Sequence, residues 1–259
     1  MKIAAFNAKR LGLRKIHDEV VRRNLIKIVS RYSVVVLLEV MGHGGRAMDL
    51  FLKELNETTA NRHRPYDIVN SGSLGRRSYM EQFVFFYRMD EVSVIDKYQY
   101  EEEDEDVLAR EPYIVKFDCP NTEVEELVLI PVHTKPEDAE IEMGALHDVV
   151  EAARTRWGSD NIMILGDFNA DGRYFNRRGR ENVRIGYPPY HWLIDDDVDT
   201  TTSDTTDHTY DRIVVFGDNM YHAVVPDSAK PFDFQRAYRL SDATTQAISD
   251  HYPVEVELL

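Results

Sequence analysis

Polar residues that could carry out acid–base chemistry around a metal ion adjoin several predicted strands of this 259-residue chain. Carboxylate and amide oxygens are the donors that Mg²⁺ and Mn²⁺ prefer, and a histidine beside a carboxylate can transfer a proton near neutral pH. One such residue alone indicates little, because most histidines have structural or surface roles. Together the group predicts a metal-assisted catalytic site, and its members are Asn7, Glu39, Glu81, His133, Asp167, Asn169, Asp211, Asp250 and His251.

The cysteine and histidine patterns disfavour zinc and disulfides. Cys119 is the single cysteine, so no intrachain disulfide can form. The sequence contains neither a cysteine cluster nor the His-Glu-x-x-His spacing of zinc hydrolases. The expected cation is therefore one that prefers oxygen ligands.

Short apolar strands are expected to position these residues. Residues 3–6, 34–38 and 162–165 each have the composition of a buried strand. They run directly into Asn7, Glu39 and the sequence Gly166-Asp167-Phe168-Asn169, which places polar groups at strand exits. Further strands are predicted at residues 82–87, 114–118, 127–132, 212–216 and 253–258.

Helices alternate with the strands. The clearest, over residues 137–157, has Pro136 before it and the apolar series Ile141, Ala145, Leu146, Val149, Val150, Ala153 and Trp157. Two more are predicted at residues 19–30 and 47–56. The mixed order without a linker favours an α/β (α+β) fold of four layers, with two mixed sheets in a sandwich flanked by helices. One domain over residues 1–259 is expected.

The charge of the chain is strongly acidic. The 46 Asp and Glu exceed the 31 Lys and Arg, which gives a net charge of −15 that repels polyanions at long range. Bound divalent cations can reverse that sign inside a carboxylate-lined cleft. The longest apolar run, residues 34–38, is far shorter than a membrane helix, so no membrane partner is expected.

Two loops are rich in acidic residues. Residues 101–106 are six consecutive carboxylates, and residues 195–207 combine six Asp with six Ser or Thr. Oxygen-rich loops of this kind suit Ca²⁺, but a solvated polar loop has the same composition. The composition alone leaves both readings open.

Ordered motifs along nearly the whole chain resemble the deoxyribonuclease I family, within the larger group of endonuclease, exonuclease and phosphatase folds. Such ordered agreement is far more specific than any one motif. The matching segments are Lys2-Ile3-Ala4-Ala5-Phe6-Asn7, Leu38-Glu39-Val40, Ser78-Tyr79-Met80-Glu81, Arg110-Glu111-Pro112, Pro131-Val132-His133-Thr134, Gly166-Asp167-Phe168-Asn169-Ala170, Tyr210-Asp211-Arg212-Ile213-Val214 and Ser249-Asp250-His251-Tyr252-Pro253.

The resemblance implies two six-stranded sheets and metal-dependent, largely nonspecific hydrolysis of double-stranded DNA to 5′-phosphate and 3′-hydroxyl ends. By this similarity Glu81 orients His133 and Asp211 orients His251; one imidazole activates water and the other protonates the leaving oxygen. Glu39 and Asp250, with Asp167 as the next candidate, would hold Mg²⁺ or Mn²⁺. Asn7 and Asn169 would orient the metal or phosphate oxygens.

The resemblance also implies DNA contacts. Tyr79 resembles a tyrosine that packs in the minor groove, and Arg110 resembles an arginine that contacts phosphate or groove. Met41 stands where the family commonly has a further arginine, so Arg46, Arg76 and Arg77 are the expected substitutes.

Other expectations concern stability and partners. The disulfides common in the family are absent, and Ca²⁺ sites at Glu102, Asp106 and Glu111 and at Asp199 and Thr201 are expected to compensate. Actin binding is not expected, because Asn70 is polar and Tyr113 bulky where relatives have an apolar edge. A secreted monomer is expected, and the acidic surface suits a salt-tolerant bacterial source.

Two alternatives remain. A phosphatase or abasic-site nuclease of the same fold would share the site, and a noncatalytic binding protein could retain the scaffold. Both histidines and both of their acidic partners are present, which favours an enzyme.

Overall fold

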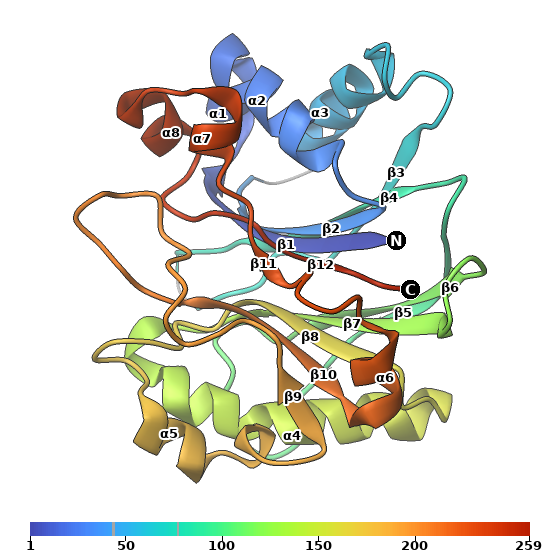
Figure 1. The fold of residues 1–259 in the computed structure, drawn as a ribbon, viewed down its shortest axis with the longest axis vertical. Helices are drawn as coiled ribbons and strands as arrows, with labels where there is room; N and C mark the ends of the chain where they lie inside the picture. Colours follow the sequence, from blue (N-terminus) through green and yellow to red (C-terminus); the bar gives the residue numbers. More distant parts are fainter. Residues whose placement is uncertain (43–44, 77) are drawn as a thin grey trace.

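Two six-stranded sheets lie face to face in the computed structural model, which describes residues 1–42, 45–76 and 78–259 (Figure 1). In spatial order the first sheet comprises β11 (Lys230–Pro231), β12 (Val254–Glu257), β1 (Lys2–Leu11), β2 (Val34–Val40), β4 (Gln82–Arg88) and β3 (Tyr66–Asn70). The second comprises β5 (Ser93–Gln99), β6 (Tyr113–Cys119), β7 (Glu125–His133), β8 (Ile162–Asp167), β10 (Asp211–Phe216) and β9 (Tyr190–Trp192).

Helices cover the outer faces of both sheets (Figure 1). Beside the first sheet lie α1 (Leu13–His17), α2 (Glu19–Val29), α3 (Arg46–Glu57), α7 (Phe234–Tyr238) and α8 (Asp242–Ile248). Beside the second lie α4 (Ala139–Trp157) and α5 (Arg177–Asn182), while α6 (Gly217–Ala223) follows β10. Short 3₁₀ turns occur at Pro136–Asp138 and Arg184–Gly186. The expected sandwich flanked by helices is confirmed.

Three apolar clusters hold the layers together. One lies between the sheets and includes Val36, Phe85 and Leu165, and the other two lie between each sheet and its helices. The central strands are buried on both faces, which explains why residues 34–38 are a continuous apolar run.

Parallel strand pairs lie at the centre of each sheet. β1 pairs with β2 and β7 with β8 in parallel, whereas the other pairings are antiparallel. Carboxyl ends of parallel neighbours meet at the same edge of a sheet. The exits of these four strands therefore bring their terminal side chains to one region.

The three predicted helices occur with shifted ends. The one predicted at residues 137–157 is a 3₁₀ turn followed by α4, and Gly158 ends it in the left-handed conformation. Its apolar series is wrong at one position, because Ile141 is 65% exposed whereas its neighbour Glu142 is buried. Glu142 turns inward because it accepts backbone hydrogen bonds from Ala109 and Lys135. None of the helices in the described ranges is long and apolar enough to cross a membrane.

Candidate active site

Asn7 joins the two sheets at the centre of the site. From β1, its Nδ2 donates hydrogen bonds to Glu39 Oε1 at 3.1 Å and to Asp167 Oδ2 at 3.0 Å. Glu39 lies in β2 of the first sheet, whereas Asp167 ends β8 of the second. The structure thus brings together three side chains that the sequence places at separate strand exits.

His133 forms a buried pair with Glu81. Its Nδ1 lies 2.5 Å from Glu81 Oε1, and Arg110 flanks the pair, with Nε 3.0 Å from the same oxygen and Nη1 donating to the His133 carbonyl at 2.9 Å. Burial alone would lower the pKa of His133, but the Glu81 carboxylate outweighs it and raises that pKa. The bond at Nδ1 orients the ring, which leaves Nε2 for chemistry.

His251 forms the second pair, with Asp211. Its Nδ1 lies 2.8 Å from Asp211 Oδ2, which also accepts a hydrogen bond from the Thr200 hydroxyl at 2.7 Å. Burial opposes the charged imidazole, yet Asp211 and Asp167 outweigh it and raise the pKa of His251 to about 10. Burial also raises the pKa of Asp211 to about 6. The raised pKa of His251 keeps a proton within the pair at neutral pH.

The two imidazoles face one carboxylate. Asp167 Oδ2 lies 3.7 Å from His133 Nε2 and 3.5 Å from His251 Nε2. Burial would raise the pKa of Asp167, but His251 and His133 outweigh it and lower that pKa, so the carboxylate stays charged. Two proton-carrying groups therefore lie on either side of a buried anion.

Two of the polar side chains belong to residues with a strained backbone conformation. Glu39 has φ +56° and Asn169 has φ +47°, a left-handed conformation that residues other than glycine seldom adopt. Gly166 permits the close approach of β8 to β7, because a Cβ there would lie 2.0 Å from the Val132 carbonyl oxygen. Strain of this kind concentrates at functional sites.

The donor set fits a divalent cation that prefers oxygen. Glu39 Oε1 and Asp167 Oδ2 converge on the same amide nitrogen, and His133 Nε2 lies 3.8 Å from Glu39 Oε1. Oxygens of Asp167 and Asp211 and a nitrogen of His251 also lie within 4.8 Å of one another. Asp211 already bonds His251 and Thr200, so we assign it to the proton-carrying pair and leave Glu39 and Asp167 as the candidate ligands.

Asp250 and Asn169 lie beside this centre in different ways. The Asp250 side chain is 48% exposed and 3.9 Å from Lys9 Nζ, so it stands at the rim. Asn169 is buried, and its Nδ2 donates to the Thr134 carbonyl at 3.1 Å. Asp250 thus lies at the rim with its Oδ1 3.9 Å from His251 Nε2, whereas Asn169 is held next to Asp167 by its own hydrogen bonds.

Of the predicted DNA-contacting residues, Tyr79 and Arg110 lie together beside this centre. Tyr79 lies with its ring centroid 5.8 Å from the guanidinium carbon of Arg110, and burial raises the Tyr79 pKa to about 12. Of the expected substitutes near Met41, Arg46 begins α3, and Arg76 instead bonds the Asp106 backbone and carboxylate. Arg77 lies outside the described residues.

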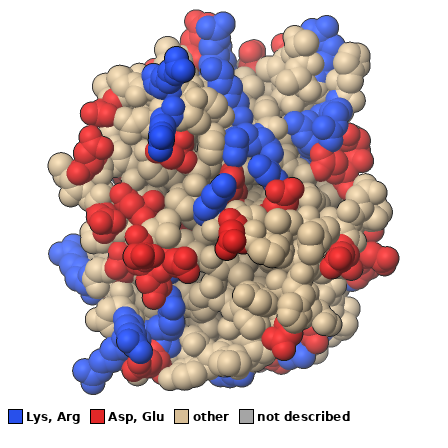
Figure 2. Space-filling view, viewed as in Figure 1, with Lys and Arg blue, Asp and Glu red and all other residues tan. Residues whose placement is uncertain are grey.

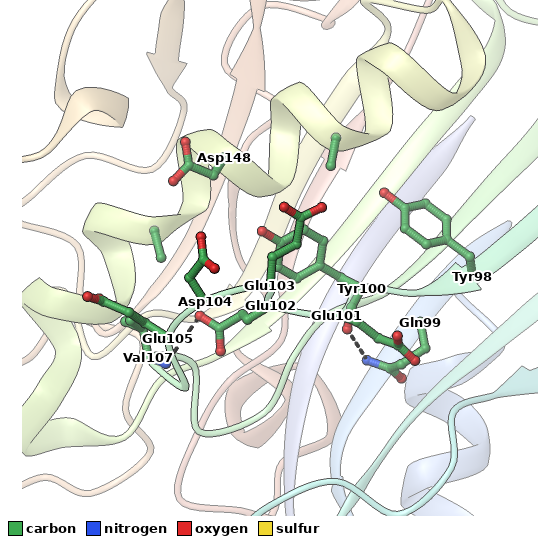
Figure 3. A pocket seen from close by; sticks show the side chains of 12 residues that line it. Tyr98, Gln99, Tyr100, Glu101, Glu102, Glu103, Asp104, Glu105, Val107 and Asp148 are labelled. Carbon is green, nitrogen blue, oxygen red and sulfur yellow. Dashed lines mark hydrogen bonds between the residues drawn. The ribbon is translucent and has the colours of Figure 1, made fainter.

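The first acidic loop forms a compact carboxylate group. Oxygens of Glu102, Asp106 and Glu111 lie within 4.8 Å of one another. The loop borders a pocket of about 640 Å³ against α4, toward which Asp148 also projects (Figure 3). Glu102 accepts hydrogen bonds from the Val107 and Leu108 backbone at 3.2 and 3.0 Å, which orders the loop. This arrangement could hold a Ca²⁺ ion.

In the second acidic loop, the Asp199 side chain forms hydrogen bonds with other residues of the same loop and the segment that follows it. Asp199 Oδ1 accepts hydrogen bonds from the Thr201 hydroxyl at 2.6 Å, the Thr201 backbone at 2.9 Å and the His208 backbone at 3.2 Å. An oxygen with three donors is less available to a cation. The two residues lie together, but the loop is already closed by its own hydrogen bonds.

Supporting residues were missed by the sequence reasoning. The Ser249 hydroxyl donates to the Asn7 carbonyl at 2.5 Å and accepts from the His251 backbone at 3.1 Å. Thr200 fixes Asp211, and buried Glu142 accepts the backbone N–H groups of Ala109 and Lys135. Ser249 and Thr200 each adjoin predicted site residues, which was their available signal, whereas nothing in the sequence around Glu142 distinguishes it.

The chain is similar to known proteins over its whole length. The model of the Endonuclease/Exonuclease/phosphatase family matches residues 4–251. Deoxyribonuclease-1 of Oryctolagus cuniculus is 43% identical over 263 residues, covering 100% of this chain and 92% of its own length. Deoxyribonuclease-1-like 1 of Homo sapiens is 40% identical over 258 residues, covering 99% of this chain and 84% of its own.

A solved structure shows the same fold at low identity. An endonuclease/exonuclease/phosphatase family protein from Leptotrichia buccalis C-1013-b superimposes with a TM-score of 0.68 at 16% identity, covering 100% of this chain and 99% of its own. Likeness at that identity establishes the fold alone. The full-length sequence similarity goes further, and the chain belongs to the endonuclease/exonuclease/phosphatase family and, within it, to the deoxyribonuclease I family.

Proposed function

We propose that this chain is a metal-dependent, largely sequence-nonspecific endonuclease that hydrolyses double-stranded DNA to 5′-phosphate and 3′-hydroxyl ends. The observation that carries the proposal is the pair of histidine–carboxylate dyads whose Nε2 atoms face Asp167 at 3.7 and 3.5 Å. Whole-length similarity to proteins named deoxyribonuclease supports DNA as the substrate.

Glu39 and Asp167, with Asp250 at the rim, would hold Mg²⁺ or Mn²⁺ against the scissile phosphate. When bound, the cation neutralises charge that develops on the phosphate and favours ionisation of a bound water. Asn7 donates to both Glu39 and Asp167, so it sets the spacing of the ligands. Asn169, fixed beside Asp167, would orient a phosphate oxygen.

The two imidazoles carry the proton transfers. In His133 and His251 the Nδ1 atom is bonded to a buried carboxylate, so Nε2 exchanges protons with the substrate. One imidazole accepts a proton from the attacking water, and the other donates a proton to the leaving 3′ oxygen. Glu81 and Asp211 stabilise the charged form of each ring.

Further properties belong to the same proposal. The chain acts as one catalytic unit over residues 1–259, as a secreted monomer without an actin partner, with structural Ca²⁺ at Glu102, Asp106 and Glu111. Acidic and basic side chains are interspersed over the face shown in Figure 2, which suits a surface that binds DNA locally despite its net charge of −15. Asp199 and Thr201 are the second candidate Ca²⁺ site.

A plasmid assay tests this function. Supercoiled DNA is incubated with the protein in EDTA, Mg²⁺, Mn²⁺ or Ca²⁺, and a phosphomonoester is supplied in parallel. Nicking with Mg²⁺ or Mn²⁺ that EDTA abolishes is expected, with little phosphomonoester turnover. Phosphate release without nicking would instead identify a phosphatase of this fold, and neither reaction would identify a noncatalytic scaffold.

A further inference from the structure

A strained bulge at the end of β1 places two cations beside the catalytic centre. β1 and β2 pair Asn7 with Leu38 and then Leu11 with Val40, so Ala8, Lys9 and Arg10 lie opposite the single residue Glu39. Lys9 has φ +42° and Arg10 φ +49°, two consecutive left-handed residues, neither of them glycine. Bulges re-aim side chains next to active sites, and such strain persists only where the surroundings hold it.

Buried and charged groups hold this bulge in place. Lys15 Nζ donates to the carbonyls of Ala8 at 2.6 Å and Lys9 at 2.8 Å. The Arg10 backbone N–H donates to Glu39 Oε2 at 3.0 Å. The backbone of Arg10 is therefore hydrogen-bonded to a candidate metal ligand, and this bond fixes the position of Arg10 relative to the catalytic centre.

The Arg10 side chain reaches Tyr79. Its guanidinium carbon lies 5.8 Å from the centroid of the Tyr79 ring, within the range of a cation–π contact. Gly75 supports this arrangement, since a Cβ there would lie 2.4 Å from the Tyr79 carbonyl oxygen. The aromatic ring thus serves as a platform that orients a planar cation.

Arg110 lies at the same distance from this ring, but its guanidinium already contacts other groups of the protein. Its side chain is 11% exposed, its Nε lies 3.0 Å from Glu81 and its Nη1 bonds the His133 carbonyl. Arg10 is exposed, and within the described ranges no carboxylate lies at ion-pair distance from its guanidinium. Lys9, by contrast, pairs with Asp250. Of these three cations, Arg10 is the one that makes no ion pair within the described ranges, which leaves its guanidinium available to an external anion.

We propose that Arg10 is a substrate-binding residue that binds a DNA backbone phosphate beside the catalytic centre, with the Tyr79 ring orienting its guanidinium. The inference rests on the proposed function. An arginine oriented by an aromatic face keeps its N–H fork for the phosphate oxygens, which favours bidentate binding. In a chain of net charge −15, this local cation offsets the repulsion between protein and DNA at the point of cleavage.

The test compares duplex DNA with a small diester, bis(p-nitrophenyl) phosphate, which has no further backbone phosphate for Arg10 to bind. In Arg10→Ala the KM for DNA is expected to rise about tenfold, with kcat and small-diester turnover within about twofold of wild type. The salt dependence of DNA binding should become shallower by about 0.9 in slope, because the variant neutralises one phosphate fewer than wild type. Arg23→Ala, which removes one exposed cation from α2, is the matched control and should change neither the KM for DNA nor the salt slope.

A second variant separates binding from folding. Arg10→Asn removes the cation but tolerates a left-handed backbone better than arginine, so its unfolding temperature should equal or exceed that of wild type while the KM for DNA rises. In a Tyr79→Leu background, Arg10→Ala should raise the KM for DNA by a smaller factor, because the ring that orients the guanidinium is absent. A DNA KM in Arg10→Ala no different from Arg23→Ala, or an equal loss on the small diester, overturns the inference. Failure of wild type to cleave DNA overturns the proposed function instead.

Discussion

Thr201 faces His251 across an isolated antiparallel bridge, so the aspartate-rich loop is joined to the segment that carries one of the two proposed catalytic imidazoles. The Thr202 backbone donates to the Asp250 carbonyl at 3.0 Å, and the Tyr252 backbone donates to the Thr200 carbonyl at 2.8 Å. The order of this loop and the position of His251 are therefore physically linked. Ligands that order the loop are expected to affect activity as well as stability.

Calcium is expected to stabilise the chain through the first acidic loop. Ca²⁺ at about a hundred times its dissociation constant should add about 2.7 kcal/mol to the free energy of unfolding, measured by thermal unfolding against EGTA. Glu102→Gln should remove most of this gain. Glu103→Gln, in the same loop but outside the carboxylate group, should retain it. An unfolding temperature insensitive to Ca²⁺ in wild type excludes a structural role for the ion.

Replacing either imidazole should nearly abolish turnover. His133→Ala and His251→Ala are each expected to lower kcat by about 10²–10⁴, because each removes a positioned proton-transfer group. The double variant should lose less than the product of the two single losses, since both groups serve the same step. His63→Ala, on the surface, is the control. Strictly multiplicative losses would show that the two rings act independently.

The stability of the metal-free protein should fall as the pH rises above neutrality. The folded pKa of His251 is about 10 against an ordinary 6.5, so the folded state binds more protons between these values. The stabilisation is fully present below about pH 6.5 and is lost as the pH approaches about 10, at no more than about 1.4 kcal/mol per pH unit for this group. Unfolding in EDTA across this range measures it.

Two comparisons check that assignment. His251→Gln should flatten the slope of stability against pH, because the titrating group has gone. Mg²⁺ should also flatten it, since a cation near Asp167 lowers the pKa of the adjacent imidazoles. A slope that is unchanged in His251→Gln would assign the pH dependence to other groups.

Glu142 should matter for both stability and turnover. Its carboxylate accepts the backbone N–H of Lys135, two residues beyond His133, and that of Ala109, next to Arg110. Glu142→Ala leaves the buried Ala109 donor and the partly buried Lys135 donor without this partner, at a cost of roughly 1–3 kcal/mol in the free energy of unfolding. Urea unfolding measures this loss. Glu140→Ala, on the exposed face of the same helix, should cost under about 1 kcal/mol. Equal losses would contradict the role of Glu142 in holding the segments beside His133 and Arg110.

The sequence predicted the central strands and missed those at the sheet edges. β3, β5, β9 and β11 are the four terminal strands of the two sheets, and none was among the predicted strands. β5 shows why, because its burial alternates and only one face is covered, which leaves no continuous apolar run. The central strands carry such runs because both of their faces are buried.

In the candidate site too, some residues were predictable from the sequence and others were not. Asn7, Glu39 and Asp167 follow apolar runs, so their positions at strand exits were predictable. Predicting that these three side chains converge would have required only the order of the strands in the two sheets. Arg10 was not predictable, because its orientation depends on a bulge between β1 and β2. The burial of Glu142 was not predictable either, since a buried glutamate in an amphipathic helix has the same sequence pattern as an exposed one.

The proposed site, with two imidazoles around the candidate metal ligand Asp167, is expected to hydrolyse the bond between phosphorus and the 3′ oxygen of DNA. Plasmid nicked by the wild-type protein in Mg²⁺ can be treated directly with DNA ligase, without kinase or phosphatase. Resealing is expected, because 5′-phosphate and 3′-hydroxyl ends are ligase substrates, and Asp167→Asn should yield almost no nicked plasmid to reseal. Nicks that ligase closes only after kinase and phosphatase treatment would contradict cleavage of this bond.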